Sequence, residues 1–161
     1  MLLPACLQRP NLVSFNSALD AVAKAGQWQE ALRLLEAINQ AGLSPNSISF
    51  NTAIHACAKS ERPDEALSLL KMMRSYGVAP DVVSYNSAIK ACGRSGRWQL
   101  SLDLLDQMRE AGVSPDTVSY NAAIAACSRS SRVDEALELL KECVSRQMCD
   151  VVTYNSAMQA C

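Results

Sequence analysis

Residues 82–116 read VVSYNSAIKACGRSGRWQLSLDLLDQMREAGVSPD, and this stretch decides the fold because the chain repeats it. An aromatic residue followed by Asn recurs every 35 residues at Phe15, Phe50, Tyr85 and Tyr120, and again after 34 residues at Tyr154. Self-similarity at a fixed period of about 20–50 residues indicates a repeat architecture, in which each unit is one supersecondary motif.

The repeat divides the whole chain when each unit is numbered from four residues before that Asn. The predicted units are 12–46, 47–81, 82–116 and 117–150, followed by a partial unit, 151–161. Unit 117–150 is one residue short. Residues 1–11 are interpreted as the tail of a preceding unit, because Pro10-Asn11 aligns with Pro45-Asn46. Since residues 151–161 supply one helix without a following partner, we expect the chain to be a piece of a longer array or a component of an assembly.

Each unit predicts two helices. Ser and Thr are good N-cap residues, so the first helices are expected to open after Ser14, Ser49, Ser84, Ser119 and Thr153. Their apolar residues are spaced i, i+3, i+4, i+7, and Gly26 and Gly96 are expected to end two of them. The second helices are predicted to start near Trp28, Pro63, Trp98 and Val133 and to end at Gly42, Gly77 and Gly112.

One such hairpin cannot bury its own apolar faces, whereas stacked hairpins can. The column Ala21, Ala56, Ala91, Ala126 and Ala160 permits close helix approach. The sequence therefore predicts an all-α fold, a right-handed superhelical α-solenoid of stacked helix-turn-helix hairpins with a concave surface.

Composition narrows the functional classes. Apolar residues make up 49% of the chain and charged residues 19%, as in an ordinary folded protein. The net charge of −1 argues against an overall basic nucleic-acid binder but leaves room for a local basic stripe. No window approaches 18 uninterrupted apolar residues, so no membrane insertion is predicted.

The seven cysteines form no C-x-x-C pair. Cys57, Cys92, Cys127 and Cys161 occupy one position per repeat. Neighbouring packed helices lie about 8–10 Å apart, whereas a Zn–S bond is about 2.3 Å long. These cysteines are therefore predicted to be small packing residues, and no metal or cofactor is expected.

The exposed face of the first helices carries three recurring residue types: an aliphatic residue, an Asn, and a cation at the helix end. Each has an alternative interpretation, since an Asn can bond the local backbone, a cation suits a helix C-terminus, and a Pro-Asp pair is common in turns. The single His55 is expected to be exposed and without a role. Alignment of all three types once per repeat instead favours single-stranded nucleic acid, with bases, base edges and phosphates as their respective partners.

The segment from Val82-Val83-Ser84-Tyr85-Asn86 to Ser114-Pro115-Asp116 resembles the plain 35-residue motif of the pentatricopeptide repeat (PPR) family, and the resemblance covers nearly the whole chain. It implies that the fifth and last residues of a repeat choose the RNA base, while the second residue packs against the bases. The implied base-reading pairs are Asn16 with Asn46, Asn51 with Asp81, Asn86 with Asp116, and Asn121 with Asp150. The implied base-sandwiching residues are Val13, Ile48, Val83, Val118 and Val152. The implied phosphate-contacting residues are Lys24, Lys59, Arg94 and Arg129.

The resemblance implies a single-stranded RNA-binding protein acting in RNA stability, processing or translation in mitochondria or plastids. Its Asn/Asp pairs resemble uridine readers and its Asn/Asn pair a pyrimidine reader, so the implied target is 5′-(C/U)UUU-3′. The alternative is a structural subunit of a larger organellar assembly, with protein partners at the open solenoid ends and no sequence-specific RNA role. No enzyme activity is expected, because the H-x-E and C-x-x-C motifs of the family's deaminase-type extension are absent.

Overall fold

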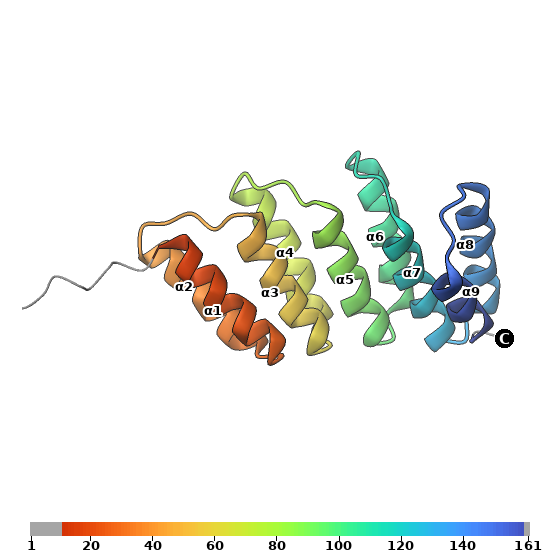
Figure 1. Cartoon of the computed structure of the whole chain (residues 1–161), viewed down its shortest axis with the longest axis horizontal. Helices are drawn as coiled ribbons and strands as arrows, with labels where there is room; N and C mark the ends of the chain where they lie inside the picture. The colour runs from red at the N-terminus through yellow and green to blue at the C-terminus, as the bar shows by residue number, and fades with distance from the viewer. Residues whose placement is uncertain (1–10, 160–161) are drawn as a thin grey trace, which may run out of the picture.

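A computed structural model of the chain describes residues 11–159, and within this range it contains nine helices and no strand. The helices follow one another as antiparallel pairs along a single array (Figure 1). They are α1 (Leu12–Lys24), α2 (Trp28–Gln40), α3 (Ser47–Lys59), α4 (Pro63–Ser75), α5 (Val82–Arg94), α6 (Trp98–Glu110), α7 (Thr117–Arg129), α8 (Val133–Ser145) and α9 (Val151–Met158). The protein is an all-α repeat solenoid, as the 35-residue period predicted.

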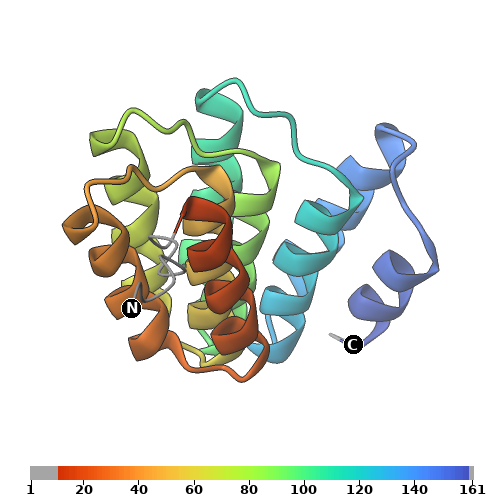
Figure 2. The same cartoon turned by 60° about the vertical axis from the view of Figure 1, so that its left-hand side comes forward.

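The odd-numbered and even-numbered helices form two different layers (Figures 1 and 2). Each odd helix contacts the next odd helix, so that α1, α3, α5, α7 and α9 make one continuous layer. Each even helix contacts its own odd partner and the following odd helix, but approaches no other even helix as closely. The even layer is therefore more open than the odd layer.

The starts of the odd helices differ from the sequence prediction. We expected N-caps at Ser14, Ser49, Ser84, Ser119 and Thr153, and this was wrong: each odd helix begins earlier. The actual N-caps are Asn11, Asn46, Asp81, Asp116 and Asp150, and their side chains accept hydrogen bonds from the backbone N–H of those Ser and Thr residues. In α3, α5, α7 and α9 the Ser or Thr hydroxyl also accepts from the cap's backbone N–H, which completes a capping box. Asn and Asp cap as well as Ser does, and the reciprocal bond favours the earlier start.

The even helices begin where the sequence predicted, at Trp28, Pro63, Trp98 and Val133. The turns between paired helices require a left-handed residue, which Gly26 and Gly96 supply with φ of 70° and 74°. None of the described helices has both the length and the apolar character needed to cross a lipid bilayer.

Every described helix contributes buried apolar residues to the core. Phe50, Tyr85 and Tyr120 are almost completely buried at the starts of α3, α5 and α7. The predicted alanine column is fully buried at Ala56, Ala91 and Ala126, whereas Ala21 is exposed and Ala160 lies outside the described residues. The small side chains allow the odd helices to approach closely, and this keeps their starts in register along the layer.

The cysteines at the repeated position are packing residues, as predicted. Cys57, Cys92 and Cys127 are completely buried. Burial raises the pKa of the Cys57 thiol to about 12 and those of Cys92 and Cys127 to about 11, so these thiols stay protonated at neutral pH. Cys161, the fourth in the column, lies outside the described residues. Among residues 11–159 no three His, Cys, Asp or Glu side chains gather as metal ligands.

A close approach between α5 and α7 gives a test of this packing. A Cβ added at Gly93 would lie 2.8 Å from Ala126 Cβ and 3.2 Å from Ala126 Cα. We expect Gly93→Val to lower the free energy of unfolding by about 1–3 kcal/mol through overpacking, measured by chemical denaturation. Lys90→Val, at an exposed position of the same helix, is the matched control for the helix propensity of valine. Equal losses in the two variants would contradict the close α5–α7 contact.

Candidate nucleic-acid interface

The exposed aliphatic residues lie near the starts of the odd helices, one per helix. Large fractions of their surfaces are solvent-accessible: Val13 71%, Ile48 58%, Val83 56%, Val118 42% and Val152 57%. Because these aliphatic side chains are exposed at one repeated position, they form an apolar row on the surface and are not part of the core. The structure thus places the five predicted base-sandwiching residues on one surface of the odd layer.

Each predicted base-reading pair comes together across neighbouring odd helices. Asn51 Nδ2 donates to both carboxylate oxygens of Asp81 at 3.1 Å, and Asn86 Nδ2 donates to Asp116 Oδ1 at the same distance. The first pair, Asn16 with Asn46, is longer at 3.4 Å, and the last pair, Asn121 with Asp150, measures 3.2 Å. The residues that the sequence paired over 29 or 30 positions are therefore direct neighbours.

A buried serine connects the two members of a pair, and sequence reasoning missed this role. Ser84 Oγ donates to Asn51 Oδ1 at 2.5 Å and lies 2.9 Å from Asp81 Oδ1. Ser119 makes the equivalent contacts with Asn86 and Asp116, at 2.6 and 2.9 Å. The signal was present in the sequence, because a Ser or Thr stands three residues after every capping Asn or Asp. The amide oxygen of the Asn is thereby occupied from within the protein.

Helix capping also fixes which atom of the cap residue remains available for a further hydrogen bond. Asp81 Oδ1 accepts the N–H of Ser84 at 2.9 Å, so Oδ2 carries most of the unused acceptor capacity. In Asn46 the bonds from Ser49 N–H, Ser49 Oγ and Asn16 all reach Oδ1. The Nδ2 group of Asn46 is thus left as a hydrogen-bond donor, where Asp81 offers an acceptor.

The capping aspartates are ionised at neutral pH. Burial alone would raise the pKa of Asp81 and of Asp116. Hydrogen bonds from the N–H and hydroxyl of the following serine and from the partner Asn outweigh burial and lower both pKa values. Two fixed carboxylates, which only accept hydrogen bonds, therefore stand next to each other in the row.

The fourth pair differs because Thr153 replaces serine. The shortened turn still brings Asp150 to the N-cap of α9, where it accepts from Thr153 N–H at 2.8 Å. Thr153 Oγ1 bonds Asp150 Oδ1 at 2.8 Å, and the buried Asn121 Oδ1 has no hydrogen-bond partner. This pair is less constrained than the pairs of the two preceding hairpins.

The predicted cations occupy the last turns of the odd helices. Lys59 Nζ bonds the backbone oxygen of Lys24, and Arg94 Nη1 bonds that of Ala58 at 3.3 Å. Lys24 pairs with Asp20 at 2.7 Å. Lys59 and Arg94 thus bond carbonyl groups at the end of the preceding odd helix. This agrees in part with the alternative interpretation that these cations stabilise helix C-termini. Their charges remain on the same surface as the Asn row.

Aliphatic, Asn and cation positions meet in one open groove over α5, α7 and α9. Its volume is about 320 Å³, and its lining residues are Lys90, Arg94, Val118, Asn121, Ala122, Ala125, Arg129, Val152 and Ser156. The exposed His55 lies on the same surface, where partial burial and the nearby Lys90, Lys59 and Arg94 lower its pKa. The groove has the size and chemistry for a flat polar ring beside an anionic group.

This fold and surface define a helical repeat protein with one equivalent set of exposed side chains per hairpin. The PPR repeat family matches residues 10–59, 45–94, 80–124 and 115–161. The chain belongs to this family. No curated protein sequence matches the chain significantly.

Solved structures of PPR proteins share the fold. The pentatricopeptide repeat protein PPR10 in complex with an 18-nt psaJ RNA element is 30% identical, with a TM-score of 0.83. PPR10 from maize is 31% identical, with a TM-score of 0.78. Each match covers 94% of this chain and 22% of PPR10, so the chain spans about a fifth of the length of these relatives. The PPR domain of Arabidopsis thaliana protein-only RNase P 1, in complex with tRNA, has a TM-score of 0.77 at 19% identity over 92% of this chain and 79% of that one.

The capping role and the lowered pKa of Asp116 give a stability prediction. Asp116→Ala removes an N-cap and should lower the free energy of unfolding by about 1 kcal/mol, whereas Asp116→Asn should be nearly neutral at pH 7. Because the folded-state pKa of Asp116 is lowered, its carboxylate stabilises the protein above the unfolded-state pKa, and this is lost as the pH falls through the folded-state pKa. Asp116→Asn should therefore lose less stability than the parent between pH 7 and pH 3, measured by urea unfolding. Asp103→Ala, at an exposed helical position, is the control.

Proposed function

We propose that this chain binds single-stranded RNA along the odd layer, with one base for each of the four hairpins that correspond to units 12–46, 47–81, 82–116 and 117–150. The observation that carries the proposal is the row of hydrogen-bonded Asn–cap pairs, each with a fixed outward-facing group between two exposed aliphatic residues. Bases would lie between successive members of Val13, Ile48, Val83, Val118 and Val152. The 30% identity to RNA-bound PPR10 supports this choice of ligand.

Base preference follows from the atom that capping leaves free. Uracil presents a donor at ring N3, while cytosine presents an acceptor there. Asp81, Asp116 and Asp150 offer a carboxylate acceptor, which favours uracil, whereas Asn46 offers an amide donor and favours cytosine at the first base. The proposed target is 5′-(C/U)UUU-3′ with cytosine preferred first, read with its 5′ end at α1. The last base is the least constrained, because Asn121 lacks the serine bond of its counterparts.

The phosphates would meet Lys24, Lys59, Arg94 and Arg129. The proposed activity is binding without catalysis, in transcript stability, processing or translation in a mitochondrion or plastid. This cellular setting rests on membership of the PPR family. A structural subunit of an organellar assembly is the competing role, and failure of the chain to bind any short RNA would favour it.

Salt dependence tests the phosphate contacts. Four contacts at about 0.7 released counterions each predict a log–log slope of about −3 for association with the single strand CUUU flanked by abasic nucleotides, measured by fluorescence anisotropy. Arg129→Gln should reduce the slope by about 0.7. Arg33→Gln, on the even layer, is the matched control and should leave the slope unchanged. A slope near zero, or equal binding of duplex RNA, would count against the proposal.

Base choice is tested at the two middle positions. Asp81→Asn with Asp116→Asn keeps both N-caps but turns an outward acceptor into a donor, so the middle preference should move from uracil to cytosine. Each position should change by roughly 1–3 kcal/mol, by analogy with base-pair discrimination in DNA complexes. Competition between CUUU and CCCU oligomers measures the change, and unfolding curves of the variant confirm that capping is retained. If the double variant still prefers uracil, these aspartates serve the turn and not the base.

A further inference from the structure

The even layer contains three pockets in equivalent positions, one between each pair of consecutive even helices. Their volumes are about 340 Å³ between α2 and α4, 250 Å³ between α4 and α6, and 180 Å³ between α6 and α8. All three have leucines in their lining, and equivalent residues are 35 positions apart. Their polar residues differ, and this difference indicates what the middle pocket binds.

The pocket between α6 and α8 holds a carboxylate supplied by the chain itself. Glu142 accepts from Arg109 Nη2 at 2.8 Å through both of its oxygens, and the hydroxyl of Tyr120 donates to Glu142 Oε1 at 2.9 Å. Asp106 adds a second acid, 2.8 Å from Arg109 Nη1. Arg146, from the end of α8, also bonds Glu142 Oε1 at 3.1 Å. On the α6 and α7 side, Arg109 and Tyr120 together form a clamp for one carboxylate.

The middle pocket keeps the clamp and lacks the carboxylate. Arg74 and Tyr85 correspond to Arg109 and Tyr120, and Arg74 Nη2 donates to the Tyr85 hydroxyl at 2.9 Å. Gln107 occupies the position that Glu142 has in the pocket between α6 and α8, and Lys71 occupies the position of Asp106. Within residues 11–159 the side chains of Lys71 and Gln107 form no hydrogen bond or ion pair, and no acid pairs with the Arg74 side chain. The hydroxyl hydrogen of Tyr85 likewise has no acceptor among the described residues.

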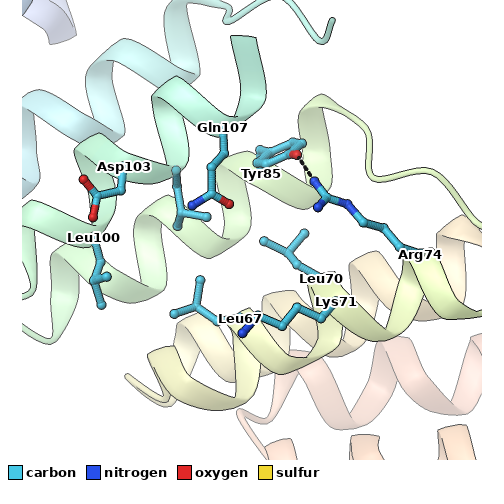
Figure 3. A pocket seen from close by; sticks show the side chains of 9 residues that line it. Leu67, Leu70, Lys71, Arg74, Tyr85, Leu100, Asp103 and Gln107 are labelled. Carbon is cyan, nitrogen blue, oxygen red and sulfur yellow. Dashed lines mark hydrogen bonds between the residues drawn. The ribbon is translucent and has the colours of Figure 1, made fainter. Parts of the chain in front are cut away.

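Figure 3 shows how these groups are arranged. Arg74 and Tyr85 are joined by their hydrogen bond at one side of the pocket, and the Gln107 amide projects from α6 toward it. Leu67, Leu70, Leu100 and Leu104 supply the apolar lining, and Asp103 is the single acid. Two cations and one acid line this pocket, whereas one cation and four acids line the pocket between α6 and α8.

The pocket between α2 and α4 gives no such clamp. Asn39 replaces the arginine and Phe50 replaces the tyrosine. Asn39 bonds the hydroxyl of Tyr76, which also packs edge-on against Phe50. Only the middle one of these three pockets combines free cationic donors with an apolar lining.

We infer that the pocket between α4 and α6 is a docking site for a partner protein that presents a glutamate side chain flanked by aliphatic residues. Its carboxylate would accept from Arg74 and Tyr85 as Glu142 accepts from Arg109 and Tyr120, and its aliphatic neighbours would cover the leucine lining. Charge complementarity favours an acidic segment, because Lys71 and Arg74 exceed the single Asp103. The pocket lies in the even layer, so a partner bound there leaves the Asn row of the odd layer accessible.

The inference is tested first by supplying the carboxylate within the chain. Gln107→Glu should form the clamp that Glu142 forms and raise the melting temperature by about 2–4 °C. In an Arg74→Gln background the same change should give no rise. If Gln107→Glu raises the melting temperature equally in both backgrounds, or lowers it in the parent, Arg74 does not hold a carboxylate there and the inference is wrong.

The second test uses the probe peptide acetyl-Ala-Leu-Glu-Leu-Ala-amide and its Gln counterpart, with methyl NMR of the leucines. We expect the Glu peptide to shift the signals of Leu67, Leu70 and Leu100 with a dissociation constant on the order of 1 mM. The Gln peptide, and the Glu peptide with Arg74→Gln or Gln107→Glu, should bind about tenfold more weakly. Arg33→Gln is the matched control and should bind like the parent.

Several results of this titration would overturn the inference. Equal shifts from the Glu and Gln peptides would show an apolar groove without carboxylate selection. Shifts from inorganic phosphate but not from the Glu peptide would show a general anion site. The same shifts on concentrating the protein alone would identify a second copy of this chain as the occupant. Because the test uses no RNA, it fails or succeeds independently of the proposed function.

Discussion

The hydrogen bond from a Ser or Thr backbone N–H to the Asn or Asp three residues earlier is the interaction on which the rest of the odd layer depends. It starts each odd helix, and it holds the capping side chain against the Asn of the preceding odd helix. The serine hydroxyl then joins both residues, so that helix initiation, contact between hairpins and the geometry of the proposed base site share one network. A substitution at any of these three positions acts on stability and on the exposed surface of the odd layer together.

The two layers differ in what they can do because they pack differently. Small residues such as Ala91 and Ala126 let the odd helices approach closely, which makes one continuous surface with a regular spacing of equivalent groups. The even helices are held mainly by the odd ones, and spaces remain between them. A continuous surface suits a linear polymer, whereas separate pockets suit individual side chains of a partner. One array can therefore present two independent surfaces.

Periodicity made most of the fold and the positions of the candidate site predictable. A single spacing of 35 residues fixes which side chains are equivalent, and the Gly and Pro residues mark the turns, so the even-helix starts at Trp28 and Pro63 were predicted correctly. The odd-helix starts were not, because Ser84 and Asp81 are both good cap residues and only the three-dimensional capping box decides between them. The clamp of Arg74 and Tyr85 was also missed. The clamp lacks an acid because Lys71 and Gln107 stand at the positions that Asp106 and Glu142 occupy in the next pocket. A repeat pattern shows which residues are equivalent, but it does not show which side chains such a difference leaves unpaired.

Helix capping limits how this surface can change its ligand preference. The residue that faces the proposed base must also accept the N–H of the residue three positions later. Good N-cap residues are chiefly Asn, Asp, Ser, Thr and Gly, and Gly has no side chain that could contact a base. Asn and Asp satisfy the cap with one oxygen, and they differ only in the second terminal atom, which is a donor in Asn46 and an acceptor in Asp81. Exchange between these two residues therefore inverts the hydrogen-bonding character toward a ligand at little cost in stability. The constraint that starts the helix thus also reduces the choice at each position to a donor or an acceptor, which is the distinction that separates cytosine from uracil.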